Sequence, residues 1–367
     1  MEHPYRADHV GSLLRPAELL AAREAYARGV IARDQLREAE DRAILGAIEL
    51  QRSAGVDVYS DGEYRRGSFL IDTTRAIGGL VEVERRPRAW QGPDVQEHQE
   101  GTEQVVGERV HRVGKLVGEE AAYLRRHAPG PYKVTMPSAN QLSSTLYREG
   151  VTDLAYPTRF DLALALGDLL RQEIQELIDD GVPYIQIDTP SYTQFCDDAY
   201  LARMRAEGHD PARLLDEWIA VDNRTLEGLR REGVTIGMHL CRGNSRGRWM
   251  REGGYGPIAA RLFSGVNVDR FLLEYDTERA GDFEPLRHVP RDKQVVLGLI
   301  TTKEGRLETE DELVQRLEEA AAYVPLENLA MSPQCGFSTN SLGNPITMDD
   351  QRRKLDVLVQ TARRVWG

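Results

Sequence analysis

Short apolar runs rich in β-branched residues alternate with longer amphipathic stretches along most of the chain. Such alternation is typical of β/α units, in which a helix follows each strand and the strands form a parallel sheet. We predict eight strands, at residues Ala7–Ser12, Val56–Tyr59, Tyr132–Pro137, Tyr184–Asp188, Val234–Leu240, Phe271–Tyr275, Gln294–Ile300 and Leu329–Ser332. Eight strands of this kind close a (β/α)8 barrel, so the sequence predicts an α/β protein with the TIM-barrel fold.

The amphipathic stretches predict the helices that surround such a barrel. Their apolar residues recur at intervals of three and four positions, which places them on one face of a helix. The expected helices are residues 16–29, 33–54, Arg159–Asp180, Pro211–Glu232, Glu310–Tyr323 and Asp349–Trp366.

The segment from about residue 65 to residue 131 does not fit a simple β/α repeat. It is long and rich in charged residues, and the stretch "GERVHRVGKLV" within it, residues 107–117, is typical of a hairpin. We therefore expect an insertion after the second strand, within one domain of residues 1–367. This insertion could pair two strands and cover the mouth of the barrel.

Charge and hydropathy exclude several classes of protein. A net charge of −12 disfavours binding to nucleic acid, which needs a basic surface. The longest apolar runs, such as Val295 to Ile300, are far shorter than the ~20 residues that cross a bilayer, and the N-terminal residues "MEHPYRADHVGSLLRP" lack the pattern of a secretion signal. Three cysteines in 367 residues do not make a disulfide framework. We expect a cytoplasmic protein that acts on small molecules, and the sequence leaves its oligomeric state open.

Polar residues follow several of the predicted strands. In a barrel of this type the active site lies at the C-terminal ends of the strands. The segment "HVGS" offers Ser12, "YSDGEYRR" offers Asp61 and Glu63, and "IQIDTP" offers Asp188. Glu63 and Asp188 could hold an ammonium group, and Ser12 with its neighbouring backbone amides could hold a carboxylate. Together these groups describe a site for an amino acid.

Ordinary structural roles would also account for the two carboxylates. Asp188 lies two residues before Pro190, where aspartate commonly forms a turn. Glu63 could face solvent and pair with Arg65 or Arg66, as many surface carboxylates do.

The fifth, sixth and eighth strands end in "GMHLCRGN", "LLEYD" and "SPQCGFST". These ends bring together one imidazole, two thiols and one carboxylate, from His239, Cys241, Glu274 and Cys335. The set matches four-coordinate Zn²⁺, whereas Cys335 taken alone would pass for a small buried apolar residue. Zinc deprotonates a bound thiol, so we predict a site that transfers an alkyl group to the sulfur of a substrate.

The remaining cysteine and a group of arginines lie outside this ligand set. Cys196 lies in a helix-like stretch without other metal ligands, and we expect it to be structural. Four arginines follow Cys241 closely, and they indicate either a solvated loop or an anion-binding mouth; they are Arg242, Arg246, Arg248 and Arg251.

The segments "HVGS", "DGEYRR", "QIDTP", "HLC", "LLEYD" and "QCGF" resemble, in chain order, those of the cobalamin-independent methionine synthase family. These enzymes use zinc to methylate homocysteine. The resemblance implies that Glu63 and Asp188 contact the amino group of the substrate and that Ser12 contacts its carboxylate. It also implies that zinc is the cofactor and that the ligands are His239, Cys241, Glu274 and Cys335. The expected donor is 5-methyltetrahydrofolate or its polyglutamate form.

Two departures from the family pattern bear on this expectation. Full-length plant and bacterial members carry a second, N-terminal barrel, so the chain is similar to the short, single-barrel members that correspond to the C-terminal catalytic domain. After the seventh strand the family has a D-I-H-S-type segment, whereas this sequence has Thr301, Thr302 and Lys303. The resemblance is therefore closer for the residues expected to bind the methyl acceptor than for those expected to act on the methyl donor.

Other functions remain open at this point. A relative such as epoxyalkane:coenzyme M transferase would use the same metal but would have no ammonium for Glu63 and Asp188. A decarboxylase like uroporphyrinogen decarboxylase shares the barrel but leaves the metal ligands without a role. A zinc-stabilised binding protein normally draws its ligands from nearby chain segments. A Schiff-base aldolase acting through Lys303 has no further support in the sequence.

Overall fold

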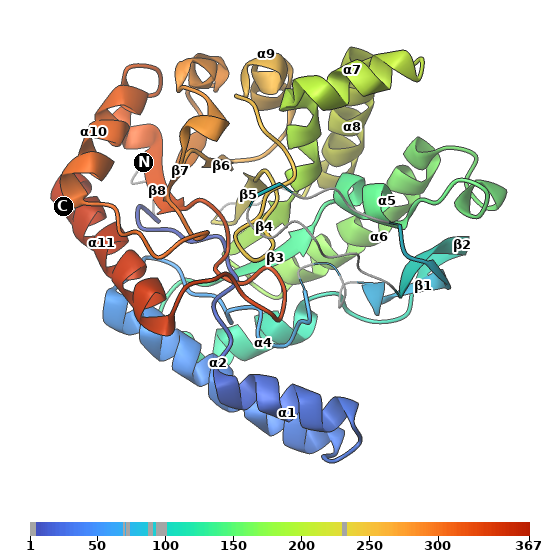
Figure 1. Ribbon diagram of the computed structural model, residues 1–367, viewed down its shortest axis with the longest axis horizontal. Helices are drawn as coiled ribbons and strands as arrows, with labels where there is room; N and C mark the ends of the chain where they lie inside the picture. Colours follow the sequence, from blue (N-terminus) through green and yellow to red (C-terminus); the bar gives the residue numbers. More distant parts are fainter. Residues whose placement is uncertain (1–4, 69, 71–73, 87–90, 93–100, 230–232) are drawn as a thin grey trace.

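The computed structural model describes residues 5–68, 70, 74–86, 91–92, 101–229 and 233–367. Its main sheet has six strands in the order β3-β4-β5-β6-β7-β8, and each strand pairs with the next in parallel. The strands are β3 (Lys133–Pro137), β4 (Tyr184–Asp188), β5 (Thr235–Leu240), β6 (Arg270–Glu274), β7 (Gln294–Ile300) and β8 (Leu329–Pro333). Figure 1 shows these strands in the middle of the molecule with helices around them. Six of the eight predicted strands are thus confirmed.

The first two predicted strands are each reduced to a single parallel bridge, but they still close the ring. Ala7 bridges to Met331 of β8, and Tyr59 bridges to Tyr132 beside β3. The amide of Asp57 donates to the carbonyl of Ala7 at 3.1 Å and so joins the two segments. The sheet therefore closes into the predicted (β/α)8 barrel.

The helices largely match the amphipathic stretches. They are α1 (Ala17–Ala27), α2 (Arg33–Ala54), α4 (Gly118–His127), α5 (Ala139–Leu146), α6 (Arg159–Asp179), α7 (Asp198–Ala206), α8 (Pro211–Leu226), α9 (Gly256–Gly265), α10 (Glu310–Ala321) and α11 (Met348–Trp366). The prediction that α8 runs to Glu232 is wrong. The helix ends at Leu226, and Gly228 then adopts a φ of 70°, a left-handed conformation that often follows a helix end. Residues 230–232 lie outside the described residues.

The insertion after the second barrel segment forms an antiparallel strand pair. Strand β1 (Ile77–Glu84) pairs with β2 (Thr102–Arg112). The predicted pairing of two strands in the insertion is confirmed, but the turn between them does not lie near residues 107–117, because residues 107–112 continue β2 and their partners lie earlier in the chain. Gln91 also bridges to Trp249, in the loop after β5, so this part of the insertion contacts a loop at the C-terminal ends of the strands.

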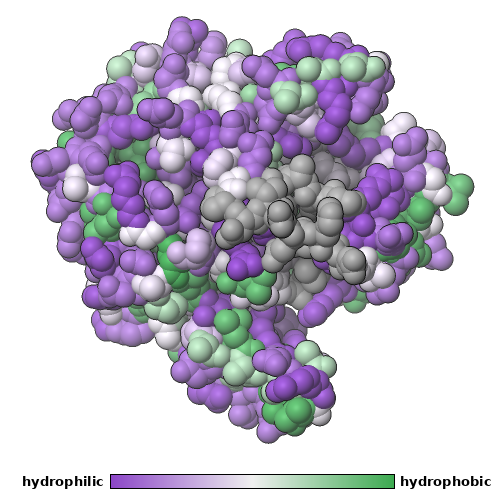
Figure 2. Space-filling model, viewed as in Figure 1, coloured by the Kyte–Doolittle hydropathy of each residue, from purple (hydrophilic) through white to green (hydrophobic). Residues whose placement is uncertain are grey.

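The face of the molecule in Figure 2 is largely polar. Figure 2 shows a face on which hydrophobic side chains are scattered among hydrophilic ones. Helix α1, which projects from the body in Figure 1, carries two of the exposed apolar residues, Leu20 and Tyr26. No helix within the described ranges is long and apolar enough to cross a membrane.

The strands separate an outer core from the interior of the barrel. Alternate residues such as Ile185 and Ile187 belong to one large hydrophobic cluster that connects residues from Ala7 to Ala362 and includes the helices. This cluster supports the organisation as one domain, which stays a prediction. Residues on the opposite faces of the strands form small separate clusters, and one of these consists of Leu272, Val296 and Ala330. Side chains alternate along a strand, so every second residue points into the barrel. The inward residues nearest the C-terminal ends of the strands are therefore the ones that face the candidate site.

His9 gives the fold a predictable sensitivity to acid. It is buried, its Nε2 lies 3.0 Å from the carbonyl oxygen of Val58, and burial lowers its pKa to about 4. Between pH 6.5 and 4 the unfolded chain binds a proton that the folded chain does not, so stability falls as pH falls. We expect this residue to cost about 3 kcal/mol of unfolding free energy below pH 4. Urea unfolding at pH 7 and pH 5 should show a weaker pH dependence in His9→Gln than in wild type.

The exposed His111 provides the matched control. His111→Gln should keep the wild-type pH dependence. Equal slopes in His9→Gln and wild type would contradict the assignment to His9.

Candidate metal centre and substrate site

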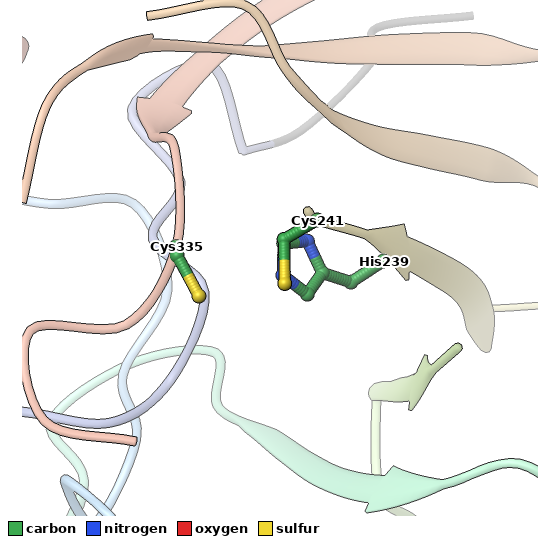
Figure 3. A group of neighbouring side chains, drawn as sticks. All are labelled: His239, Cys241 and Cys335. Carbon is green, nitrogen blue, oxygen red and sulfur yellow. The ribbon is translucent and has the colours of Figure 1, made fainter. Parts of the chain in front are cut away.

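Three of the four predicted metal ligands come together at the ends of two strands. His239 lies near the end of β5, Cys241 follows β5 directly, and Cys335 lies two residues after β8. Their potential ligand atoms all lie within 4.8 Å of one another, and all three residues are buried. Figure 3 shows the sulfur of Cys335 directed toward Cys241 and the His239 ring.

The chemistry of these side chains fits a metal ion that prefers nitrogen and sulfur. Both ring nitrogens of His239 are buried and have no hydrogen-bond partner in the described part of the chain. A hydrogen bond with Cys335 lowers the pKa of Cys241 well below its ordinary value, and the same interaction raises the pKa of Cys335. A buried imidazole without partners beside a stabilised thiolate is a donor set that could hold a metal.

Glu274, the fourth predicted ligand, lies at the end of β6 but does not join this group. Its Oε1 accepts a hydrogen bond from Arg279 Nη2 at 2.8 Å and lies 3.8 Å from Lys303 Nζ. Its Oε2 accepts the backbone N–H of Arg242 at 2.8 Å. Burial acts to raise the pKa of Glu274, but the cations Lys303, Arg242 and Arg279 lower it to about 2. The carboxylate is therefore charged, and its oxygens already have partners.

The two carboxylates predicted to bind an ammonium group are both buried. Glu63 Oε1 accepts a hydrogen bond from Thr135 Oγ1 at 2.8 Å, and its Oε2 has no partner among the described residues. Asp188 Oδ1 accepts from Gln186 Nε2 at 2.8 Å. Burial raises the pKa of Asp188 to about 7, and although His239 opposes this shift, the charge of Glu63 adds to it. Two acids whose charges repel in a buried place favour a cationic ligand.

The environment of Glu63 differs from that of an ordinary surface carboxylate. Glu63 is 4% exposed, so it is not a solvent-facing carboxylate, although it does form the expected ion pair with Arg66, at 3.9 Å. It also adopts a φ of 58°, which is uncommon outside glycine. Asp61 supports this turn, because its Oδ1 accepts the N–H of Glu63 at 2.9 Å.

Ser12 lies against the loop that carries Cys335. Its carbonyl accepts the N–H of Phe337 at 2.9 Å. A Cβ atom at Gly336 would lie 1.9 Å from Ser12 Oγ and 3.1 Å from Ser12 Cβ, so a larger residue at position 336 would force the Ser12 side chain or the two loops to shift. The structure therefore brings Ser12 next to the candidate metal ligands.

The four arginines after Cys241 do not share one environment. Arg242 is fully buried, donates to the carbonyls of Gly253, Glu274 and Ala280, and stacks on Tyr255 at 4.4 Å. Of the others, Arg248 is buried, Arg246 is exposed, and Arg251 is half-buried. Both interpretations are wrong for Arg242, because its guanidinium holds the backbone of two loops together.

Cys196 agrees with its prediction as a structural residue. It is buried in the short 3-10 helix Pro190–Cys196, and burial raises the pKa of its thiol to about 12.

Thr135 and Gln186 were missed in the sequence, although each contacts a candidate site carboxylate. Both occupy inward positions of their strands, two residues before the strand ends. The alternation of side chains along a strand could have identified them. The contacts of Arg279 and Lys303 with Glu274 depend on loop conformation, for which the sequence carries no comparable signal.

Comparison with known proteins gives a consistent assignment. Residues 144–363 match the family model described as the catalytic domain of cobalamin-independent synthase. The uncharacterised protein YxjG of Bacillus subtilis is 36% identical over 366 residues, which cover 99% of this chain and 95% of that protein. The methionine synthase of Pyrococcus abyssi is 23% identical, and the match covers 89% of this chain and 85% of that protein.

A solved structure agrees with these relatives. It is that of a putative vitamin-B12 independent methionine synthase from Listeria monocytogenes, 31% identical with a TM-score of 0.76, and the match covers 100% of this chain and 99% of that one. The match to the family model and the similarity along the whole chain show that this protein is a methyltransferase that belongs to the cobalamin-independent methionine synthase family.

Proposed function

We propose that this protein is a zinc-dependent methyltransferase that methylates homocysteine to methionine without cobalamin. The observation that carries the proposal is the juxtaposition of a buried group of nitrogen and sulfur ligands with two buried carboxylates. The proposed donor is 5-methyltetrahydrofolate or its polyglutamate form, and the proposed location is the cytoplasm.

His239, Cys241 and Cys335 would hold the zinc ion, with Glu274 beside them as the fourth candidate ligand. Zinc supplies a centre that keeps a thiol deprotonated, and therefore nucleophilic, at neutral pH. The burial of all four side chains keeps bulk water away from this sulfur.

The chain supplies the groups that would orient the amino-acid part of the substrate. The free Oε2 of Glu63 can accept a hydrogen bond from the ammonium group. A cation beside Asp188 would favour its charged form and so lower a pKa that burial has raised to about 7. Ser12, on the loop that contacts the Cys335 loop, is the proposed partner of the carboxylate.

The position of Arg242 weighs against coenzyme M as the thiol. Arg242 does not supply a cationic partner for a sulfonate, because its guanidinium is hydrogen-bonded to backbone carbonyls. The buried carboxylates of Glu63 and Asp188 would repel a sulfonate, whereas they attract an ammonium group.

Calorimetry on the zinc-loaded protein tests this proposal. We expect wild type to bind homocysteine with release of a proton and not to bind coenzyme M. Glu63→Gln should weaken homocysteine binding about 10- to 100-fold, because it removes a charge-assisted hydrogen bond. It should leave the affinity for 2-mercaptoethanol, which has no amino group, unchanged.

Glu119→Gln is the matched control, because Glu119 is exposed and pairs with Arg37 on the surface. It should leave both affinities unchanged. Reduced wild-type protein with much less than one zinc ion per chain, or tight binding of coenzyme M, would refute the proposal. An assay of methionine formation with methyltetrahydrofolate and with its triglutamate form then tests the donor.

A further inference from the structure

Lys303 places a buried positive charge beside the candidate metal centre. It lies in the loop after β7, where the family resemblance leads one to expect a histidine-containing segment. Lys303 is 8% exposed, and its Nζ has no hydrogen-bond partner within the described residues. Glu274 Oε1 lies 3.8 Å from this Nζ.

The loop conformation holds Lys303 in this place. The backbone N–H of Thr301 donates to Glu308 Oε1 at 2.9 Å, and that of Lys303 donates to Thr301 Oγ1 at 3.2 Å. Thr302 Oγ1 donates to the carbonyl of Gly336, next to Cys335, at 3.2 Å. The β7 loop is thereby fixed to the loop that carries a metal ligand.

The other cations near Glu274 are engaged by the protein itself. Arg279 donates to Glu274 and lies 3.4 Å from Asp276, and its guanidinium stacks on Trp249 at 4.7 Å. Arg242 is bound to backbone carbonyls. Lys303 differs from both, because it has a nearby charge but no hydrogen bond.

The charges of the site indicate what such a cation could compensate. Two thiolates would balance the charge of a divalent ion, and the Glu274 carboxylate is already paired with Arg279. A substrate thiolate adds one more negative charge to a place from which water is excluded. Burying an uncompensated charge is costly, so an additional cation is needed when the thiolate binds.

We propose that Lys303 compensates the charge of the substrate thiolate, and that it therefore strengthens thiol binding while it weakens metal binding. This inference rests on the proposed function, because it assumes a zinc ion and a thiol substrate. Its physical basis is the fixed positive charge of Lys303, which repels a dication and attracts a thiolate.

The variant Lys303→Met should change the two affinities in opposite directions. We expect metal-free Lys303→Met to bind Zn²⁺ about 10-fold more tightly than wild type. The zinc-loaded variant should bind both homocysteine and 2-mercaptoethanol about 10- to 100-fold more weakly. Competition with a chromophoric chelator measures the first affinity, and calorimetry measures the second. A merely structural role would weaken both.

Two further variants control this experiment. Lys303→Arg keeps the charge and should keep both affinities within about threefold of wild type. Lys293→Met removes a buried lysine at the opposite end of β7, whose Nζ donates to the carbonyl of Phe263 at 3.0 Å, and it should leave both affinities unchanged.

The possible outcomes separate this inference from the proposed function. If Lys303→Met binds Zn²⁺ and the thiols as tightly as wild type does, or binds both more weakly, this inference is wrong and the proposed function is not affected. Weakened binding of homocysteine but not of 2-mercaptoethanol would also overturn it, because Lys303 would then contact the carboxylate. If wild type binds 2-mercaptoethanol but not homocysteine, the proposed function fails, and the opposite shifts in Lys303→Met still support the role of Lys303.

Discussion

Cys335→Ala is expected to abolish zinc binding and to lower methyl transfer about 10³-fold, in a protein that still folds. The ligand atoms of His239, Cys241 and Cys335 lie within 4.8 Å of one another. The substitution removes one thiolate from this group and leaves His239 and Cys241. A tenfold change in rate corresponds to about 1.4 kcal/mol of activation free energy, so the expected effect is about 4 kcal/mol. Metal analysis of the purified protein and an assay of methionine formation check this result.

Cys196→Ala is the matched control for this substitution. Cys196 is also buried, but it lies in the 3-10 helix after β4 and belongs to no group of three or more potential metal ligands among the described residues. Both variants replace a small buried side chain, so urea unfolding should show similar small losses of stability. Cys196→Ala should keep its zinc and its activity. Retention of stoichiometric zinc by Cys335→Ala would show that Cys335 is not a ligand.

The barrel strands show how far local pattern determines this fold. Strand β4 occupies the predicted residues Tyr184–Asp188, in which Ile185 and Ile187 alternate with polar residues as in a strand. The segment Ala7–Ser12, in which Val10 is the only β-branched residue, forms only one bridge. Here Asp8 Oδ1 accepts the backbone N–H of His9 at 2.7 Å, and Gly11 adopts a φ of 137°. Both features compete with a regular strand.

The candidate site was predictable where it depends on strand ends and not where it depends on loops. His239, Cys241 and Cys335 are recognisable because a parallel barrel brings strand ends to one rim. Arg242 could not be placed, because its role depends on the carbonyls of Gly253 and Ala280, which lie 11 and 38 residues further along the chain. In the same way, the partners that occupy Glu274 come from loops whose course no periodic pattern encodes.

The barrel interior also contains a buried ionic network, which no strand pattern reveals. Asp8 lies between two cations, with Lys133 Nζ at 2.7 Å and Arg270 Nη1 at 3.2 Å. The hydroxyl of Tyr184 donates to Asp8 Oδ2 at 3.0 Å. All four side chains are fully buried. Burial acts to raise the pKa of Asp8, but Lys133 and Arg270 lower it, so the carboxylate is charged at neutral pH.

Asp8→Asn should therefore destabilise the protein by about 3–5 kcal/mol at pH 7, because it leaves two buried cations without their counter-charge. The double variant Asp8→Asn with Lys133→Met should be more stable than Asp8→Asn alone, since it removes one of these uncompensated charges. Asp168→Asn breaks an exposed ion pair with Arg224 at 3.2 Å and should cost less than about 1 kcal/mol. Urea unfolding of the four proteins measures these differences. A loss in Asp8→Asn no larger than that in Asp168→Asn would mean that the network does not stabilise the barrel.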